Sequence, residues 1–308
     1  AEYLQFAEKY FSDLKKKDIT DAFERPSINW VYGKTDIGTY LNSKLMVEEY
    51  TTEVTGKDLY DLIGSNIIKD YELIVAIDGV TDEKVNGFFT ASDLNKNNKK
   101  GVGATGNGVL TQVFVDPVDE EITVAIINTY LAFADKDYDE KKDELDITAY
   151  GLEKANKEYV KVASNRSNNV NDKVSFTLSG EDFDVAEAVE GDALLVTVAK
   201  GDVQTIADPE IIAFKKNSNV TGDGTKYSYA DSAEYDFEVL DNYTGAAGTN
   251  LKNVTYNVYL DAYGYAIGVD LVSAPNNYLF ITGIDKSYSN LANKTLSASA
   301  IFVDGTTK

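Results

Sequence analysis

Alternating runs of Val, Ile, Thr, Tyr and Phe, each closed by a cluster of Gly, Asn or Asp, recur along most of this chain and constrain its fold. Alternation at every second residue places apolar side chains on one face of a β-strand, and the closing residues favour tight turns. We therefore predict a mainly β, β-rich α+β protein with two or more small antiparallel β-sandwich or barrel-like modules. Strands are expected at residues 28–32, 45–54, 71–77, 109–115, 122–130, 174–178, 193–199, 254–260 and 278–281.

An internal echo strengthens this prediction. Residues 109–127 read VLTQVFVDPVDEEITVAII and residues 254–272 read VTYNVYLDAYGYAIGVDLV, so each is a strand that ends in Asp, a turn and a second strand. The same strand-to-Asp ending returns at 75–80 (VAIDGV) and at 301–306 (IFVDGT). An Asp at the end of a strand can accept hydrogen bonds from the turn, which indicates related hairpins. The last turn has no returning strand after it, so we expect this chain to be a fragment of a longer one.

Two helices and one boundary stand out from the β pattern. Apolar residues spaced at period 3.6 predict an amphipathic helix over residues 2–15, with Lys15 to Lys17 at its C-terminal end. A short second helix is expected at 58–63, capped by Asp58 and ended by Gly64. The polar stretch 163–172 cannot bury much apolar surface. We therefore predict an N-terminal helix at 1–17 and β-rich domains at 18–160 and 165–308.

The composition removes several classes of function. The chain has no Cys and no His, which excludes Ser-His-Asp and Cys-His triads, zinc sites built from His and Cys, and disulfides. A formal charge of −22 repels phosphate backbones and anionic lipids, so neither nucleic acid nor membrane is an expected partner. A glycosidase needs only two carboxylates, but among 51 acidic residues a suitable pair carries no specificity. We predict that the protein is not an enzyme and has no cofactor, with calcium as the one candidate ligand.

Calcium is the one metal that the sequence suggests. Asp135, Asp137 and Asp139 alternate, so an extended loop would present their oxygens on one side. A hydrated charged loop is the competing interpretation. Residues 93–97 (DLNKN) have a similar rhythm, but neither run has the Gly of an EF-hand loop at its sixth position.

The aromatic residues and one glycine-rich run invite functional interpretations of their own. Trp30 lies in an alternating strand pattern and is expected in the core rather than on a sugar-binding platform. The GxGxxG run at 101–106 precedes a strand instead of a helix, which predicts a loop and not a dinucleotide site. Tyrosines crowd the C-terminal region, where sheet packing competes with a contact surface; they are Tyr256, Tyr259, Tyr263, Tyr265, Tyr278 and Tyr288.

The C-terminal part of the chain contains the segments NVTYNVYLDAYGYAIGVD (253–270), NNYLFITG (276–283) and NLANKTLSASAIFVDGT (290–306). These segments resemble a recurrent, β-rich region of bacterial S-layer homology (SLH) surface proteins. Further similar segments are RPSINWVYGKTDIGTY (25–40), GNGVLTQVFVD (106–116), ITVAIINTYLA (122–132) and EGDALLVTVAKGDVQTIADPE (190–210). The resemblance implies a secreted protein of a Gram-positive-type bacterium, held at the cell surface by SLH modules that bind cell-wall polysaccharide. No SLH module is recognisable within residues 1–308, so wall attachment would come from modules outside this chain.

These observations lead to two hypotheses from different classes. The first is a non-enzymatic, structural segment of an SLH-type, S-layer-like envelope protein, which contacts neighbouring surface-protein subunits. The alternative is a surface adhesin or binding module that recognises a host protein or glycan through Tyr-rich strand faces. Both place the chain outside the cell, at the cell wall.

Overall fold

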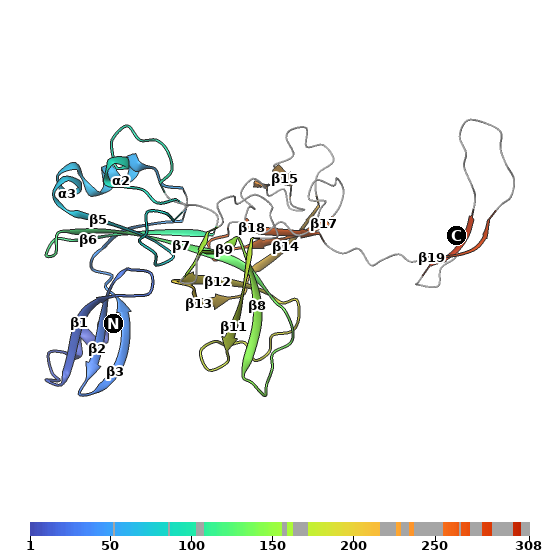
Figure 1. The fold of residues 1–308 in the computed structure, drawn as a ribbon, viewed down its shortest axis with the longest axis horizontal. Coiled ribbons are helices and arrows are strands. Elements are labelled where there is room, and N and C mark those ends of the chain that lie inside the picture. Colours follow the sequence, from blue (N-terminus) through green and yellow to red (C-terminus); the bar gives the residue numbers. More distant parts are fainter. Residues whose placement is uncertain are drawn as a thin grey trace. The chain divides into compact units, whose positions relative to one another are not determined.

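The computed structural model describes residues 1–51, 53–85, 87–102, 108–155, 159–162, 172–215, 226–228, 234–236, 255–264, 266–271, 279–284 and 298–302 (Figure 1). The helices are α1 (Glu2–Ala7), α2 (Gly56–Ile63), α3 (Ser65–Asp70) and the 3-10 turn η1 (Ala91–Asp93). The strands are β1 (Leu14–Thr20), β2 (Pro26–Tyr32), β3 (Thr35–Leu41), β4 (Met46–Tyr50), β5 (Glu72–Ile77), β6 (Val109–Asp116), β7 (Glu121–Ala134), β8 (Glu144–Tyr150), β9 (Leu152–Ala155), β10 (Tyr159–Val162), β11 (Lys173–Ser179), β12 (Ala193–Ala199), β13 (Asp202–Ala207), β14 (Glu210–Lys215), β15 (Lys226–Ser228), β16 (Glu234–Asp236), β17 (Thr255–Leu260), β18 (Ala266–Leu271), β19 (Leu279–Ile284) and β20 (Ala298–Phe302).

The predicted mainly β fold is confirmed, because strands make up 50% of the chain and helices 11%. Each of the predicted strand segments overlaps an observed strand. Both halves of the internal echo are hairpins: β6 pairs with β7, and β17 is hydrogen-bonded to β18. The alternating pattern therefore identified the strands correctly.

One long strand, β7, organises the central eight-stranded sheet. Its first half pairs with β6 on one side and β5 on the other, and its second half pairs with β12 and β8. The sheet continues through β4, β11 and β13 at its edges. Most of these pairs are antiparallel, but β5 and β7 run parallel. Almost every residue of β7 is buried, as the nearly unbroken apolar run predicts for a strand covered on both faces.

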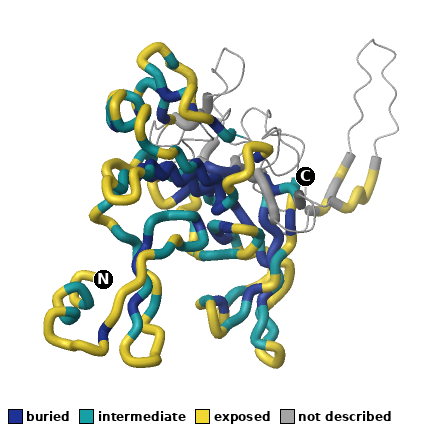
Figure 2. The backbone as a smooth tube through the Cα atoms, turned by 60° about the vertical axis from the view of Figure 1, so that its left-hand side comes forward, coloured by how far each residue is buried: buried dark blue, intermediate teal, exposed yellow. Residues whose placement is uncertain are grey.

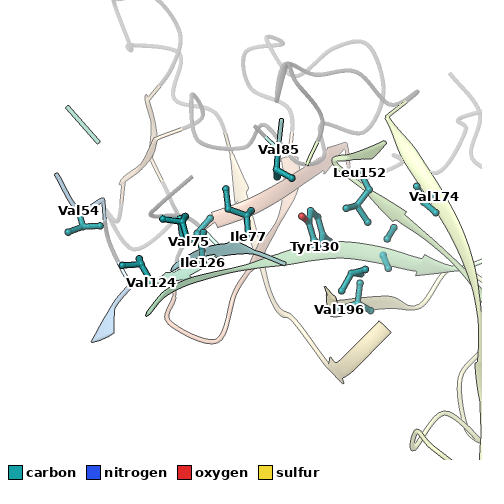
Figure 3. Packing of buried hydrophobic residues seen from close by; sticks show 14 of the residues in the cluster. Val54, Val75, Ile77, Val85, Val124, Ile126, Tyr130, Leu152, Val174 and Val196 are labelled. Atoms are coloured by element: carbon teal, nitrogen blue, oxygen red, sulfur yellow. The ribbon is translucent and has the colours of Figure 1, made fainter. Parts of the chain in front are cut away.

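The two faces of β7 pack against different elements. Ile122, Val124, Ile126 and Tyr130 belong to the largest hydrophobic cluster, part of which Figure 3 shows. Helix α2 contributes Leu59 and Ile63 to the same cluster. On the opposite face, Ile127 packs with Phe23 and Ala199, while Leu131 packs with Leu195, Tyr259 and Ile267. Figure 2 shows the buried residues gathered along this sheet.

The second predicted helix is present, but its capping residue is different. Thr55 is the N-cap of α2, and its side chain accepts a hydrogen bond from the backbone N–H of Asp58. The Asp58 carboxylate in turn accepts from the backbone N–H of Thr55, which completes a capping box. Gly64 ends the helix as predicted. Helix α3, which the sequence did not indicate, follows at once.

The N-terminal helix is much shorter than predicted. Helix α1 covers only Glu2–Ala7, and the chain returns as β1, which pairs with β2 from Leu14 opposite Tyr32. The interpretation of residues 1–17 as one helix is therefore wrong, because cross-strand pairing with β2 overrides local helical spacing. Leu14, Ile28 and Trp30 form a small core that Leu4 and Ala7 of α1 cover.

The predicted boundary between 160 and 165 does not separate two sheets. Strand β11 pairs with β8 and β12 pairs with β7, so strands from both sides of that boundary share the central sheet. Most of the polar stretch 163–172 lies outside the described residues. The chain divides instead into one unit at Ala1–Asp270 and a second at Leu271–Lys308. In the second unit, β19 and β20 form an antiparallel pair with Phe280 largely exposed.

The recurring Asp residues at strand ends take two different roles. Asp116 accepts from the N–H groups of Val118 and Asp119 in its own turn, as predicted. Asp261 is buried and accepts from Tyr263 in its turn, and also from the Gly108 N–H across the fold at 2.8 Å. Asp304 lies outside the described residues. Thus one sequence pattern serves both local turns and long-range contacts.

Asp78 departs furthest from the predicted role. Its buried carboxylate accepts from the Asn128 N–H at 2.8 Å, from the Asn128 side-chain amide at 3.1 Å and from the Tyr130 hydroxyl. The turn that it begins is tight, because Asp78 and Gly79 both have positive φ and Ile77 exchanges two backbone hydrogen bonds with Val80. The carboxylate therefore fastens the end of β5 to β7.

The same turn is the meeting point of three further segments. A Cβ atom at Gly79 would lie 2.0 Å from the carbonyl oxygen of Ala22, so only glycine allows this approach. Lys200, in the turn between β12 and β13, donates its N–H to the Asp78 carbonyl at 3.0 Å and pairs with Glu24 through its side chain. These contacts join three parts of the fold at the Asp78–Gly79 turn: the N-terminal sheet, β5 and the β12–β13 hairpin.

We expect the substitution Asp78→Asn to lower the free energy of unfolding by about 1–3 kcal/mol, because one buried acceptor oxygen becomes a donor facing other donors. Asn tolerates positive φ, so backbone strain does not contribute. Urea unfolding followed by circular dichroism measures the loss. The matched control Asp116→Asn keeps the Oδ1 acceptor of an exposed turn and should change stability by less than about 0.5 kcal/mol. Equal losses in the two variants would contradict the role given to Asp78.

Candidate interaction surfaces

The structure separates the three carboxylates of the predicted calcium site. The Asp135 carboxylate accepts from the Thr148 hydroxyl at 3.0 Å, Asp137 from the Glu190 N–H at 2.9 Å and Asp139 from the Lys141 N–H at 3.1 Å. Each thus binds a different part of the protein. Across the part of the chain that the structure describes, no three acidic side chains gather as a metal site would require. Calcium binding stays a prediction that this geometry does not favour.

A thermal melt tests calcium directly. We expect the midpoint to be the same, within about 1 °C, in millimolar calcium and in excess chelator, because a ligand that binds only the folded state raises the midpoint. A rise of several degrees with calcium that Asp137→Asn abolishes would establish the site. Magnesium at the same concentration controls for ionic strength.

The other sequence candidates have structural roles where they are described. Trp30 is fully buried in the core of the N-terminal sheet, which confirms that prediction. In the run at residues 93–97, the Asp93 carboxylate accepts a hydrogen bond from the backbone N–H of Thr90 as part of a capping box. Residues 103–107 of the glycine-rich run lie outside the described residues.

The C-terminal tyrosines are described only in part. Tyr259 is buried, and its ring meets Phe133 edge to face at a centroid distance of 5.6 Å. Sheet packing therefore accounts for Tyr259. Tyr263 is half exposed in the turn after β17, and burial raises its pKa, with a further contribution from Glu49. The side chains of Tyr256, Tyr265, Tyr278 and Tyr288 lie outside the described residues.

Exposed aromatic rings cluster instead at the N-terminus, on what we call the aromatic–lysine surface. It comprises Tyr3 (91% exposed), Phe6 (62%), Tyr10 (69%), Phe11 (53%) and Tyr32 (47%), with the exposed lysines Lys9 and Lys16. Lys16 pairs with Glu8, and the register of β1 places Lys15 and Lys17 on the opposite face of the sheet. The rings of Phe6 and Tyr10 are 5.0 Å apart, and those of Phe11 and Tyr32 are 6.4 Å apart. Leu4 and Ala7 of α1 face the core, so the helix carries apolar side chains both inward and outward.

A second surface is a groove lined by apolar and acidic residues, and we call it the acid-rimmed groove. The groove has a volume of about 710 Å³ and lies at the start of β12, beside the loops that precede β12 and β14. Its apolar lining is Val185, Ala186, Ala188, Ala193, Leu194, Pro209 and Ile211, and its acidic residues are Asp184, Glu187, Asp192 and Asp208. Among the described residues that line it there is no Lys or Arg. Ile211 and the neighbouring Val189 are half exposed.

Sequence reasoning missed both surfaces. The sequence predicts one amphipathic helix over residues 2–15, whereas α1 ends at Ala7 and the rings of Tyr3, Phe6, Tyr10 and Phe11 are exposed. The groove joins residues 184–194 with residues 208–211, which no sequence spacing connects. The available signal was the segment EDFDVAEAVEGD at 181–192, which mixes acidic and apolar residues without a basic one.

A third hollow, of about 550 Å³, has five acidic residues among its described lining residues. It lies between the N-terminal sheet and the β6–β7 turn, where Asp18, Glu24, Asp116, Asp119 and Glu121 line it beside Ile74 and Phe114. Burial raises the pKa of the Glu121 carboxyl, and the nearby charges of Asp119, Glu72 and Asp116 raise it further. This hollow therefore disfavours added negative charge.

The raised pKa predicts how pH acts on stability at Glu121. A carboxyl with a higher pKa in the folded chain stabilises the fold when protonated, below about pH 4.3, and that contribution is lost as the pH rises through the raised pKa. We expect Glu121→Gln to melt higher than the wild type at pH 7 and equally near pH 4. The exposed control Glu83→Gln should show no such pH-dependent difference. A lower midpoint for Glu121→Gln at pH 7 would contradict the assignment.

No protein-family model, curated protein or solved structure matches this chain. Within the residues that the structure describes, no helix is long and apolar enough to cross a membrane.

Proposed function

We propose that this chain is a non-enzymatic, structural segment of an SLH-type bacterial envelope protein, exposed at the cell surface and attached to the wall by modules outside the chain. The observation that carries the proposal is the use made of buried carboxylates. In the described residues these are Asp78 and Asp261, and each accepts hydrogen bonds from backbone N–H groups that hold strands together. These two buried carboxylates therefore have a structural role.

The fold supports the same interpretation. The central sheet is built around one strand that is buried on both faces, and turns such as Asp78–Gly79 attach neighbouring sheets to it at fixed points. This arrangement suits a stiff spacer. The sequence resemblance to SLH surface proteins supplies the expected location, and the high negative charge keeps an exposed chain hydrated.

The alternative is an adhesin or binding module that recognises a host protein or glycan. Its specific support is the half-exposed Tyr263 at the β17–β18 turn, since an amphipathic ring at a turn suits a contact surface. A panel of glycans and matrix proteins would separate the two proposals. Saturable binding with a dissociation constant of about 1–10 µM or tighter, lost in Tyr263→Ser, would favour the adhesin.

The location predicts a labelling result. Antibodies raised against residues 1–270 should label intact cells of the encoding bacterium, and protease added outside the cells should remove the signal. An intracellular protein of the same cells must stay protected, as the control. Labelling only after permeabilisation would overturn the proposed surface role.

A further inference from the structure

We propose that the N-terminal sheet is a releasable arm. Residues 1–42 undock from the central sheet as one folded unit when the turn between β1 and β2 leaves its contact site, before either sheet unfolds. Local opening of this kind requires a segment that has few contacts with the rest of the fold and a core of its own. The inference goes beyond the structural role proposed above and does not rest on it.

The arm is attached through one short turn. Among the described strands, β1, β2 and β3 pair only with one another, so no ladder of backbone hydrogen bonds joins them to the central sheet (Figure 1). Within the residues that the structure describes, the side-chain hydrogen bonds and ion pairs from residues 1–41 to the rest of the chain come from Glu24 and Arg25. Glu24 pairs with Lys200, and Arg25 donates to the Gln112 side chain at 3.0 Å. The attachment is therefore confined to one end of the arm.

Phe23 is the apolar centre of that attachment. Its side chain is 6% exposed and packs against Ile127 of β7 and Ala199 of β12. The Arg25 guanidinium lies over the Phe23 ring, 5.1 Å from the ring centroid. The ion pair of the same turn is partly exposed to solvent, and such pairs add little to stability. Withdrawal of one aromatic ring is therefore the main cost of undocking.

The turn keeps its shape without the central sheet. The Asp21 carboxylate accepts from the Phe23 N–H at 2.9 Å and from the Arg25 N–H at 3.0 Å. The same carboxylate accepts from the Arg25 side chain at 2.8 Å. All of these groups lie within residues 21–25, so their hydrogen bonds stay intact when the turn moves away.

The arm also has a core of its own. The side chains of this core all come from residues 1–42; they are Leu4, Ala7, Leu14, Ile28, Trp30 and Tyr40. A three-stranded sheet with a covered hydrophobic face meets the minimum that independent stability requires of a β structure. The arm therefore stays folded when it undocks. Trp30, the one tryptophan of the chain, is fully buried and reports on this core.

Beside the turn, a hollow replaces packing between the arm and the central sheet. Carboxylates line both of its walls, with Asp18 and Glu24 on the arm and with Asp116, Asp119 and Glu121 on the side of the central sheet. Like charges on facing walls add no attraction. Contact between the two sheets is therefore concentrated at the turn.

Distances between two spin labels test the proposal, because the chain has no Cys and is labelled only where one is introduced. The substitution Lys34→Cys labels the exposed β2–β3 turn of the arm. Lys69→Cys labels α3, whose Ile67 and Ile68 pack against the central core. The full 308-residue chain should show one narrow distance. As urea is added, the distance distribution should broaden at a lower concentration than the one at which Trp30 emission shifts to the red.

Two paired variants isolate the role of the turn. Phe23→Ser/Lys200→Ser removes the buried ring and the ion pair, and it should replace the narrow distance by a broad distribution without urea while Trp30 emission stays unchanged. The matched control Phe6→Ser/Lys16→Ser removes an exposed ring and an ion-paired lysine within the arm. This control should keep the narrow distance of the wild type.

Each of the other possible results would overturn the proposal. Urea transitions of the distance and of Trp30 emission that coincide would mean that the arm does not undock before it unfolds. A broad distance in the wild type, or a narrow one in Phe23→Ser/Lys200→Ser, would mean that the turn does not hold the arm. Red-shifted Trp30 emission in that variant would mean that the arm has no core of its own.

Discussion

The structure of residues 1–270 depends on the hydrogen bonds that the buried Asp78 carboxylate accepts from β7. They fasten β5 beside the strand on which the central sheet is built, and they fix a turn against which Ala22 and Lys200 pack. A buried carboxylate is costly unless its oxygens are satisfied, so the cluster imposes one arrangement on the segments around it. Asp261 acts in the same way where the β17–β18 hairpin meets Gly108.

In a chain without Cys or His, the hydrogen bonds of buried Asp residues fix the arrangement of the central strands. Its strands are punctuated by Asp residues, and where such a residue becomes buried it serves as a polar clamp between segments distant in sequence. The other carboxylates of the described residues are partly or fully exposed, and several of them set the charge of the grooves and hollows. The same residue type therefore has two roles: buried carboxylates hold strands together, and exposed carboxylates set the surface charge.

The exposed features of the molecule differ from one surface to the next. The N-terminal surface carries exposed aromatic rings beside Lys9 and Lys16, whereas the groove formed by residues 184–194 and 208–211 combines apolar and acidic side chains. Net charge alone would predict repulsion between copies. Contacts are decided locally, however, since charges more than about 10 Å apart are largely screened at physiological salt.

Residue order alone established the class of fold and most strands, because the period of two in segments such as β6 and β12 is a local property of the chain. It also located Trp30 in a core and the two related hairpins. Only the tertiary structure ended α1 at Ala7, set β5 parallel to β7 and brought residues 184–194 beside residues 208–211. These outcomes follow from pairing and packing between distant segments, whose energies exceed the helical preference of residues 2–15 and leave no local trace.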